Sequence, residues 1–284
     1  MTSIIKTINM RRSCRTYEIR PIEQDKRSAL EEFLTANNTG PFGSQLRFIL
    51  SDLQQIKLQE AKVPGTYGVI QGAQFFIIGA VGKSEMSMED FGYAMEKNVL
   101  YATESGLGTC WLGGTFKRTG FARIIDLQED ELLPAVTPLG YPKQTKSLTD
   151  RIFRYMASSD KRKPWEQIFF LNNLDTPLSG DHAGDFSQVL ECLRIGPSAS
   201  NRQPWRIIKE EDSMNFHFYL KRTPGYGNLI GGISLQNIDM GIAMCHFELS
   251  AREMGLNGQW VRQIFPGAKA APGSLEYIVS WVGA

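Results

Sequence analysis

Two stretches of this chain carry the same residue pattern 149 positions apart. Both have a glycine followed closely by an Ala-Met pair, then a Gly-Leu pair and a tryptophan; these are Gly92, Ala94, Met95, Gly106, Leu107 and Trp111 against Gly241, Ala243, Met244, Gly255, Leu256 and Trp260. Two further matches come earlier in each half and in the same order, 30–34 against 190–193 and 43–47 against 201–205. A duplicated unit of about 140 residues has the size of one domain. The 284-residue chain is therefore predicted to contain two fused copies of one fold.

Apolar spacing predicts the same order of elements in both copies: helix, breaker loop, strand, long helix, glycine cap, tryptophan and strand. In the first copy this gives helices at 4–10, 25–36 and 88–104, a helical turn at 120–125, and strands at 47–51, 72–81 and 133–140. Residues 143–154 are polar and basic, without an apolar period, and we interpret them as a connector. The predicted repeats are residues 1–150 and 151–284.

Composition excludes several functional classes. The chain has 31 Lys and Arg residues against 30 Asp and Glu, a formal net charge of +1, which gives no support for a nucleic acid or an anionic membrane as partner. Its four cysteines are scattered and form no C-x-x-C pair, so neither a zinc site nor a secreted disulfide framework is expected. No signal peptide is recognisable, and no run reaches the about 18 apolar residues that a membrane span requires. A soluble, cytoplasmic protein is expected.

The stretch from Ile195 to Arg206 reads Ile-Gly-Pro-Ser-Ala-Ser-Asn-Arg-Gln-Pro-Trp-Arg. Gly196 and Pro197 end the preceding helix, and the small residues that follow leave the backbone open to a ligand. Hydroxyl, amide and backbone N–H groups then offer directional hydrogen bonds to a flat molecule with polar edges. An ordinary loop between a helix and a strand, rich in turn formers, explains the same composition.

Two segments of the first copy also suggest ligand contacts. Residues 11–15 read Arg-Arg-Ser-Cys-Arg, and arginine grips phosphate with two parallel N–H bonds. A basic turn on a solvated surface is the alternative. Gly113 and Gly114 follow Trp111 and would let a ligand approach main-chain N–H groups closely.

The two copies have diverged unequally at these segments. The basic cluster at 11–15 has no basic counterpart around Lys163-Pro164-Trp165-Glu166, and Gly113-Gly114 is replaced by Arg262-Gln263. Conversely, the Pro-Ser-Ala-Ser-Asn run at 197–201 is replaced by Gly-Pro-Phe-Gly-Ser at 40–44. If a ligand binds between the copies, the chain retains one complete site, and the symmetry-related site has decayed.

Three of these motifs resemble the nitroreductase family of flavoproteins. The Arg-Arg-Ser-x-Arg cluster at 11–15, Gly-Leu-Gly-x-x-Trp at 106–111 and Pro-Ser-x-x-Asn-x-Gln-Pro-Trp at 197–205 are similar to that family's signatures. The resemblance implies an α+β fold, with an antiparallel-rich sheet flanked by helices. Ordinary members are homodimers with two FMN molecules at the subunit interface, whereas this chain resembles the single-chain variety, in which two repeats form the dimer-like unit internally. A monomer with one FMN site at the seam is expected.

The resemblance also implies roles for individual residues. Arg11, Arg12 and Ser13 would hold the FMN phosphate and ribityl chain, and Arg15 would lie near the pyrimidine edge of the flavin. Leu112, Gly113 and Gly114 match the loop that approaches flavin N5 and O4, and Arg151 would complete the phosphate pocket. The second repeat would contribute Pro197, Ser198, Ala199, Ser200, Asn201 and Gln203. Many family members have an acidic residue in the loop facing N5, which this sequence lacks.

By this resemblance the chain is expected to be an FMN-dependent oxidoreductase that passes hydride from NADH or NADPH, through flavin N5, to a small electron acceptor of the nitroaromatic or quinone type. Because the flavin carries the chemistry, no catalytic side chain and no metal is assigned. The absence of a G-x-G-x-x-G fingerprint is compatible with a nicotinamide that only stacks on the flavin. Two alternatives stay open: a non-catalytic flavin-binding protein for storage or sensing, and a flavin enzyme of the same fold with different chemistry, such as dehalogenation or flavin destruction.

Overall fold

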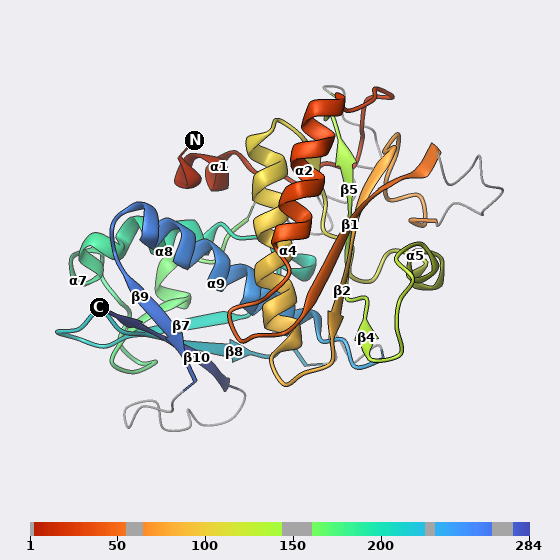
Figure 1. Ribbon diagram of the computed structural model, residues 1–284. Helices are drawn as coiled ribbons and strands as arrows, with labels where there is room; N and C mark the ends of the chain where they lie inside the picture. The colour runs from red at the N-terminus through yellow and green to blue at the C-terminus, as the bar shows by residue number, and fades with distance from the viewer. Residues whose placement is uncertain (1–2, 55–64, 144–160, 225–230, 263–274) are drawn as a thin grey trace.

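The computed structural model describes residues 3–54, 65–143, 161–224, 231–262 and 275–284. Two sheets lie on either side of two long helices, α4 (Ser87–Glu104) and α9 (Leu235–Glu253), which cross at the centre of the molecule (Figure 1). Within the described residues, no helix is long and apolar enough to cross a membrane. The predicted repeat boundary at residues 150 and 151 lies outside the described residues and stays a prediction.

The first sheet is antiparallel, with the strand order β1-β2-β5-β3 and with β4 paired to β2. Its strands are β1 (Leu46–Asp52), β2 (Phe75–Gly82), β3 (Gly108–Thr109), β4 (Glu131–Leu132) and β5 (Val136–Gly140). Besides α4, this part has the helices α1 (Ile4–Met10), α2 (Gln24–Ala36) and α5 (Arg118–Ile124) among those that lie wholly within the described residues.

The second sheet has the order β6-β7-β8-β10-β9, with β6 parallel to β7 and all other pairs antiparallel. Its strands are β6 (Phe169–Leu171), β7 (Trp205–Lys209), β8 (Phe216–Lys221), β9 (Gly258–Val261) and β10 (Leu275–Gly283). The described residues of this part also form α7 (Gly180–Ala183), α8 (Ser187–Arg194) and the short 3-10 helices η1 (Trp165–Gln167), η2 (Gly184–Phe186) and η3 (Ala199–Asn201).

The two sheets repeat one topology. In each, two antiparallel strands that are consecutive in the chain come before the long helix, and two more strands of the shared order follow it. The later of these lies beside the second of the strands that precede the helix, and the earlier one lies at the edge. The order β1-β2-β5-β3 therefore corresponds to β7-β8-β10-β9. Both long helices end at a glycine with positive φ, +77° at Gly106 and +75° at Gly255, which is the left-handed conformation that favours glycine. The predicted duplication and α+β class are confirmed.

Glycines allow the two long helices to pack closely. A Cβ atom added at Gly92 would lie 2.1 Å from the carbonyl oxygen of Ile238, and one added at Gly241 would lie 2.0 Å from the carbonyl oxygen of Glu89. Gly92 and Gly241 are equivalent positions of the two repeats. Gly92 contacts the residue three positions before Gly241, and Gly241 contacts the residue three positions before Gly92. Such a reciprocal contact is the signature of an isologous, two-fold interface, here formed within one chain.

The predicted elements agree closely with the observed ones, with two corrections. Strand β5 starts at Val136, not at residue 133, and a separate short strand, β4, precedes it. Pro134 lies between them, and proline cannot donate a ladder hydrogen bond. The sequence also predicts a buried stripe of Ala29, Leu30, Phe33 and Leu34 on the helix at 25–36; in α2 Leu30 and Leu34 are buried, whereas Ala29 is exposed.

Candidate active site

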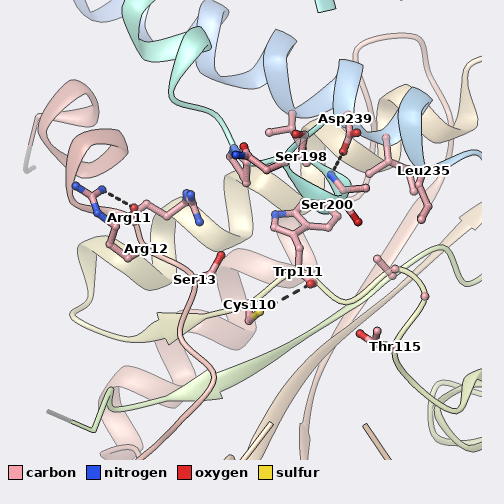
Figure 2. Close-up of a pocket in the computed structure, with 18 of the residues that line it drawn as sticks. Arg11, Arg12, Ser13, Cys110, Trp111, Thr115, Ser198, Ser200, Leu235 and Asp239 are labelled. Carbon is pink, nitrogen blue, oxygen red and sulfur yellow. Dashed lines mark hydrogen bonds between the residues drawn. The ribbon is translucent and has the colours of Figure 1, made fainter. Parts of the chain in front are cut away.

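A cavity of about 680 Å³ lies where the two repeats meet (Figure 2). This volume falls within the usual range of about 300–1,000 Å³ for small-molecule and cofactor sites. Eleven residues that the sequence analysis assigned to the site line it: Arg11, Arg12, Ser13, Arg15, Gly113 and Gly114 from the first repeat, and Pro197, Ser198, Ala199, Ser200 and Asn201 from the second. Segments about 180 positions apart in the chain therefore share one cavity, as the duplication predicts.

Three other predicted site residues are not among the lining residues. Leu112 is 2% exposed: its side chain packs into the core beside the sheet, and its backbone pairs with Val136, which positions the adjoining Gly113. Gln203 is buried behind the loop: its Oε1 accepts the Lys163 amide at 2.7 Å. Arg151 lies outside the described residues.

Arg11 and Arg12 form the basic end of the cavity. Arg11 is the C-cap of α1 and only 6% exposed, and burial lowers its pKa from the ordinary value. Its Nε lies 3.8 Å from Oε1 of the fully buried Glu96. The Nη1 of Arg12 donates to the carbonyl oxygens of Asn9 and Arg11, both at 2.7 Å. These carbonyl bonds orient the Arg12 guanidinium without neutralising its charge.

Glu96 connects the arginine end to residues of both repeats. It accepts a hydrogen bond from Trp111 Nε1 at 2.7 Å and is bonded to His246 Nε2 at 2.9 Å. His246 Nδ1 lies 2.8 Å from the carbonyl oxygen of Cys192, and a carbonyl can only accept, so Nδ1 carries the hydrogen. The network therefore holds Arg11 and Trp111 at the cavity from helices α4, α8 and α9.

The loop from Ser198 to Gln203 has a constrained backbone. Ser200, Asn201 and Gln203 have φ of 47°, 54° and 48°, in the left-handed region that non-glycine residues rarely occupy. Each such residue costs about 1–3 kcal/mol and persists only where its surroundings enforce it. Here Ser198 Oγ accepts the Gln203 amide at 2.9 Å, and Gln203 Nε2 donates to the Asn201 carbonyl at 3.0 Å. A loop fixed in this way presents its N–H and hydroxyl groups in a set arrangement.

The glycine segment forms part of the opposite wall. A Cβ at Gly113 would lie 2.6 Å from Cδ2 of Leu235, whereas one at Gly114 would meet nothing within 4 Å. Arg118 donates to the carbonyl oxygens of Gly113, Leu133 and Pro134 at 2.8–3.1 Å and so fixes the segment. Gly113 thus lies against the second repeat, and Gly114 leaves space.

Sequence reasoning missed the contribution of α9 to the cavity. Leu235, Ile238, Asp239 and Ile242 line it, and their spacing of three and four residues places them on one face of that helix. The same period is typical of core packing, so it did not mark these residues as site residues. The other lining residues that were not predicted are Asn9, Cys110, Trp111, Thr115, Ala135, Arg162 and Ile195.

Asp239 is the acidic residue of this cavity wall. Its Oδ1 accepts the Ala199 amide at 2.9 Å, which anchors the constrained loop to α9. Burial raises the pKa of Asp239 to about 8, and the hydrogen bond from Ala199 opposes that shift. Figure 2 shows Asp239 and Leu235 across the cavity from Arg11 and Arg12. The site thus has two electrostatically different ends.

Comparison with known proteins decides the family. Residues 3–251 match the model of a family described as "Putative TM nitroreductase". The chain belongs to this family. A search of curated proteins finds no match.

Solved structures place this TM nitroreductase family member in the nitroreductase-like fold. A "putative nitroreductase" from Thermotoga maritima aligns over 99% of this chain and 94% of its own, with a TM-score of 0.60 and 19% identity, which shows a shared fold. A nitroreductase family protein from Clostridium novyi NT covers 52% of this chain and 90% of its own (TM-score 0.40, 24% identity). A nitroreductase with bound FMN from Bacteroides fragilis covers 52% and 92% (TM-score 0.39, 19% identity).

In this member of the TM nitroreductase family, the symmetry-related position is built differently. Asp90 is the counterpart of Asp239, and its two carboxylate oxygens accept the amides of Phe42 and Ser44, both at 2.9 Å. Phe42 packs against the core of the second repeat. Arg262 stands where the first repeat has Gly113, and it pairs with Glu85 at 2.7 Å. The residues that line the cavity on one side are thus replaced on the other by an aromatic ring and an ion pair.

Proposed function

We infer that this chain is an FMN-dependent oxidoreductase that takes hydride from NADH or NADPH and reduces a small acceptor of the nitroaromatic or quinone type. One observation carries the proposal: one cavity at the seam of the repeats joins an arginine end, where Arg11 is buried and Arg12 is exposed, to a glycine-lined, apolar end. The B. fragilis relative with bound FMN has the same fold class, and the family match covers most of this chain.

The arginine end fits a phosphate group. Arg12 has no carboxylate partner among the residues described, and Arg11 shares Glu96 with His246. A phosphate dianion would supply the missing negative charge, and guanidinium groups bind it through charge-assisted hydrogen bonds. Ser13 adds a hydroxyl on the same wall. We propose that these three residues hold the phosphate and ribityl chain.

The other end fits a flat ring. Gly113 and Gly114 have no side chains to displace it, and Leu235, Ile238 and Ile242 offer an apolar wall. Bound FMN would supply hydride acceptance and electron transfer, while the protein supplies binding, orientation and electrostatics. Trp111 and the α9 side chains exclude water from that end. Arg15 is proposed to face the polar edge of the ring.

One observation favours the non-catalytic alternative. A Cβ added at Gly113 would lie 2.6 Å from Cδ2 of Leu235, so the end of this side chain lies directly against the glycine segment. A flavin whose reactive face is covered would bind without turning over. Storage or sensing would then be the function, with the same cavity and the same cofactor.

The test separates the two functions. Purified protein should be yellow, and flavin released by denaturation should approach one FMN per chain. Anaerobic NADH or NADPH should then bleach the visible absorbance, and a quinone should restore it. Bound flavin that neither nucleotide bleaches would support the non-catalytic function, whereas colourless protein that does not bind FMN in a titration would refute both. Size-exclusion chromatography should show a monomer, because the dimer-like unit is internal.

A further inference from the structure

Asp239 has an unused carboxylate oxygen at the cavity. The residue is 2% exposed, and Oδ1 is occupied by the Ala199 amide. Oδ2 has no hydrogen-bond partner among the described residues. Buried polar atoms are rarely left unsatisfied, since an unmade bond costs about 1–3 kcal/mol. Asp239 borders the cavity, and a ligand bound there would provide the missing partner once the atoms that cover Oδ2 move aside.

The first repeat shows what the structural role alone requires. Asp90 stands 149 positions earlier and also anchors a loop to the long helix, but there both oxygens accept backbone amides, from Phe42 and Ser44. In the second repeat one oxygen is sufficient to anchor the loop. The free oxygen of Asp239 is therefore surplus to the structural role, and it occurs only in the repeat whose loop lines the cavity.

The surroundings of Asp239 favour its protonated form. Its neighbours on the same wall are Leu235, Ile238 and Ile242, and burial is the cause that raises its pKa to about 8. The titratable groups on the elements that face this turn of α9 are Glu89, Asp90 and Tyr93 on α4, Arg202 after η3, and the cavity arginines Arg11, Arg12, Arg15 and Arg162. At neutral pH the carboxyl group therefore carries a hydrogen, which Oδ2 can donate.

We propose that Asp239 selects the electron acceptor by donating a hydrogen bond from Oδ2 to a neutral oxygen of that acceptor, such as a nitro or quinone oxygen. This inference rests on the proposed function. Asp239 transfers no proton in this role: it orients the acceptor against the ring by a bond that forms only when the carboxyl group is protonated.

Two variants isolate this bond. In Asp239→Asn the amide oxygen still accepts the Ala199 amide, and the NH₂ group donates at every pH, so the variant mimics the protonated acid. Asp90→Asn is the matched control, because it makes the same change on the symmetry-related helix, away from the cavity. Asp90 has two amide donors, so its variant is expected to lose stability and to leave acceptor binding unchanged.

The measurement is the dissociation constant of 1,4-naphthoquinone for the oxidised FMN-loaded protein, followed by the visible flavin spectrum without reductant. Only the protonated fraction binds well, so affinity in the wild type should fall about tenfold between about pH 6 and about pH 9. Asp239→Asn should bind as the wild type does at about pH 6 and stay unchanged at higher pH, while Asp90→Asn should follow the wild-type profile.

Two outcomes would overturn the inference. One is a quinone affinity that does not change with pH in the wild type, or that falls with rising pH equally in Asp239→Asn. The other is a pH dependence that appears in FMN binding to the apoprotein and not in quinone binding, which would mean that Asp239 meets the flavin. Either result leaves the proposed function intact if the protein binds FMN and NADH or NADPH bleaches it. Failure to bind FMN would instead refute the proposed function itself.

Discussion

Replacing Glu96 with glutamine tests the electrostatics of the arginine end. The change keeps the size of the side chain: the glutamine oxygen can still accept from Trp111, and its NH₂ group can donate to Nε2 of His246 in the neutral tautomer that carries its hydrogen on Nδ1. What is lost is the negative charge 3.8 Å from Arg11 Nε, in a place where both side chains are buried. Glu96→Gln therefore removes a charge while the hydrogen-bond pattern can persist.

The separation sets the expected magnitude. At 3.8 Å and an effective dielectric constant of about 20, the attraction between unit charges is about 4 kcal/mol, which agrees with the about 3–5 kcal/mol typical of breaking a buried ion pair. For a chain of this size, each 1 kcal/mol lowers Tm by about 2–4 °C. The apoprotein of Glu96→Gln should thus melt about 8–16 °C below the wild-type apoprotein.

A bound phosphate should reverse part of this loss, because it brings a negative charge to the same arginine. Adding FMN, or inorganic phosphate alone, should therefore raise the Tm of Glu96→Gln more than that of the wild type. Differential scanning calorimetry of apo and loaded protein measures both effects. Glu276→Gln is the control: it breaks an Arg222–Glu276 pair in which the side chains are 42% and 49% exposed, and such a pair is worth about 1 kcal/mol or less. An apoprotein of Glu96→Gln as stable as the wild type would refute the reasoning.

Three further predictions concern packing, cofactor binding and pH. Gly241→Ala should destabilise the protein by about 1–3 kcal/mol or more in urea unfolding, because its Cβ would meet backbone atoms of α4, whereas Gly180→Ala, with open space around its Cβ, should change little. Arg12→Ala should weaken FMN binding about tenfold to about a hundredfold in a fluorescence titration, since hydrogen bonds to charged groups contribute about 1.5–3 kcal/mol; unchanged affinity would exclude Arg12 from the phosphate site. Because the pKa of Asp239 is raised in the folded state, folding binds a proton between about pH 4 and about pH 8, so apoprotein stability should fall as pH rises through this window. Asp239→Asn should reduce that slope, and a slope identical to that of the wild type would contradict the raised pKa.

Sequence patterns predicted the elements well because their signals are local. The long helix at Ser87–Glu104 has a repeated apolar period, and Phe75–Ile78 form an apolar run that is buried on both faces of β2. The duplication extended these signals, since each repeat supports the interpretation of the other. The sequence predicts the start of β5 too early because apolar residues continue on both sides of Pro134. Strand pairing cannot continue through that proline, since it has no N–H to donate.

The site was predicted in part, for a related reason. Arg11, Arg12 and the loop at 197–201 carry distinctive residue types, and they line the cavity. The α9 wall also lines the cavity but carries no distinctive residue types. A helix face with Leu235, Ile238 and Ile242 has the same sequence pattern whether it packs against protein or borders a ligand. The special state of Asp239 depends on burial and on which amides reach it, and no spacing in the sequence encodes either. The resemblance assigns Gln203 to the ligand, whereas in the structure its side chain bonds the Lys163 amide and the Asn201 carbonyl.

The reciprocal glycines Gly92 and Gly241 have a consequence for how this molecule can change. In a homodimer every mutation is made twice, once in each subunit, so both copies of a site must be kept or lost together. A fused chain is released from that rule, and Asp90 and Asp239 have taken separate paths within it. The helix crossing is the exception: each glycine fits only while the backbone of the other repeat stays in place. The two halves can therefore evolve independently at many positions, whereas the glycine contact and the cavity that both repeats line require them to change together.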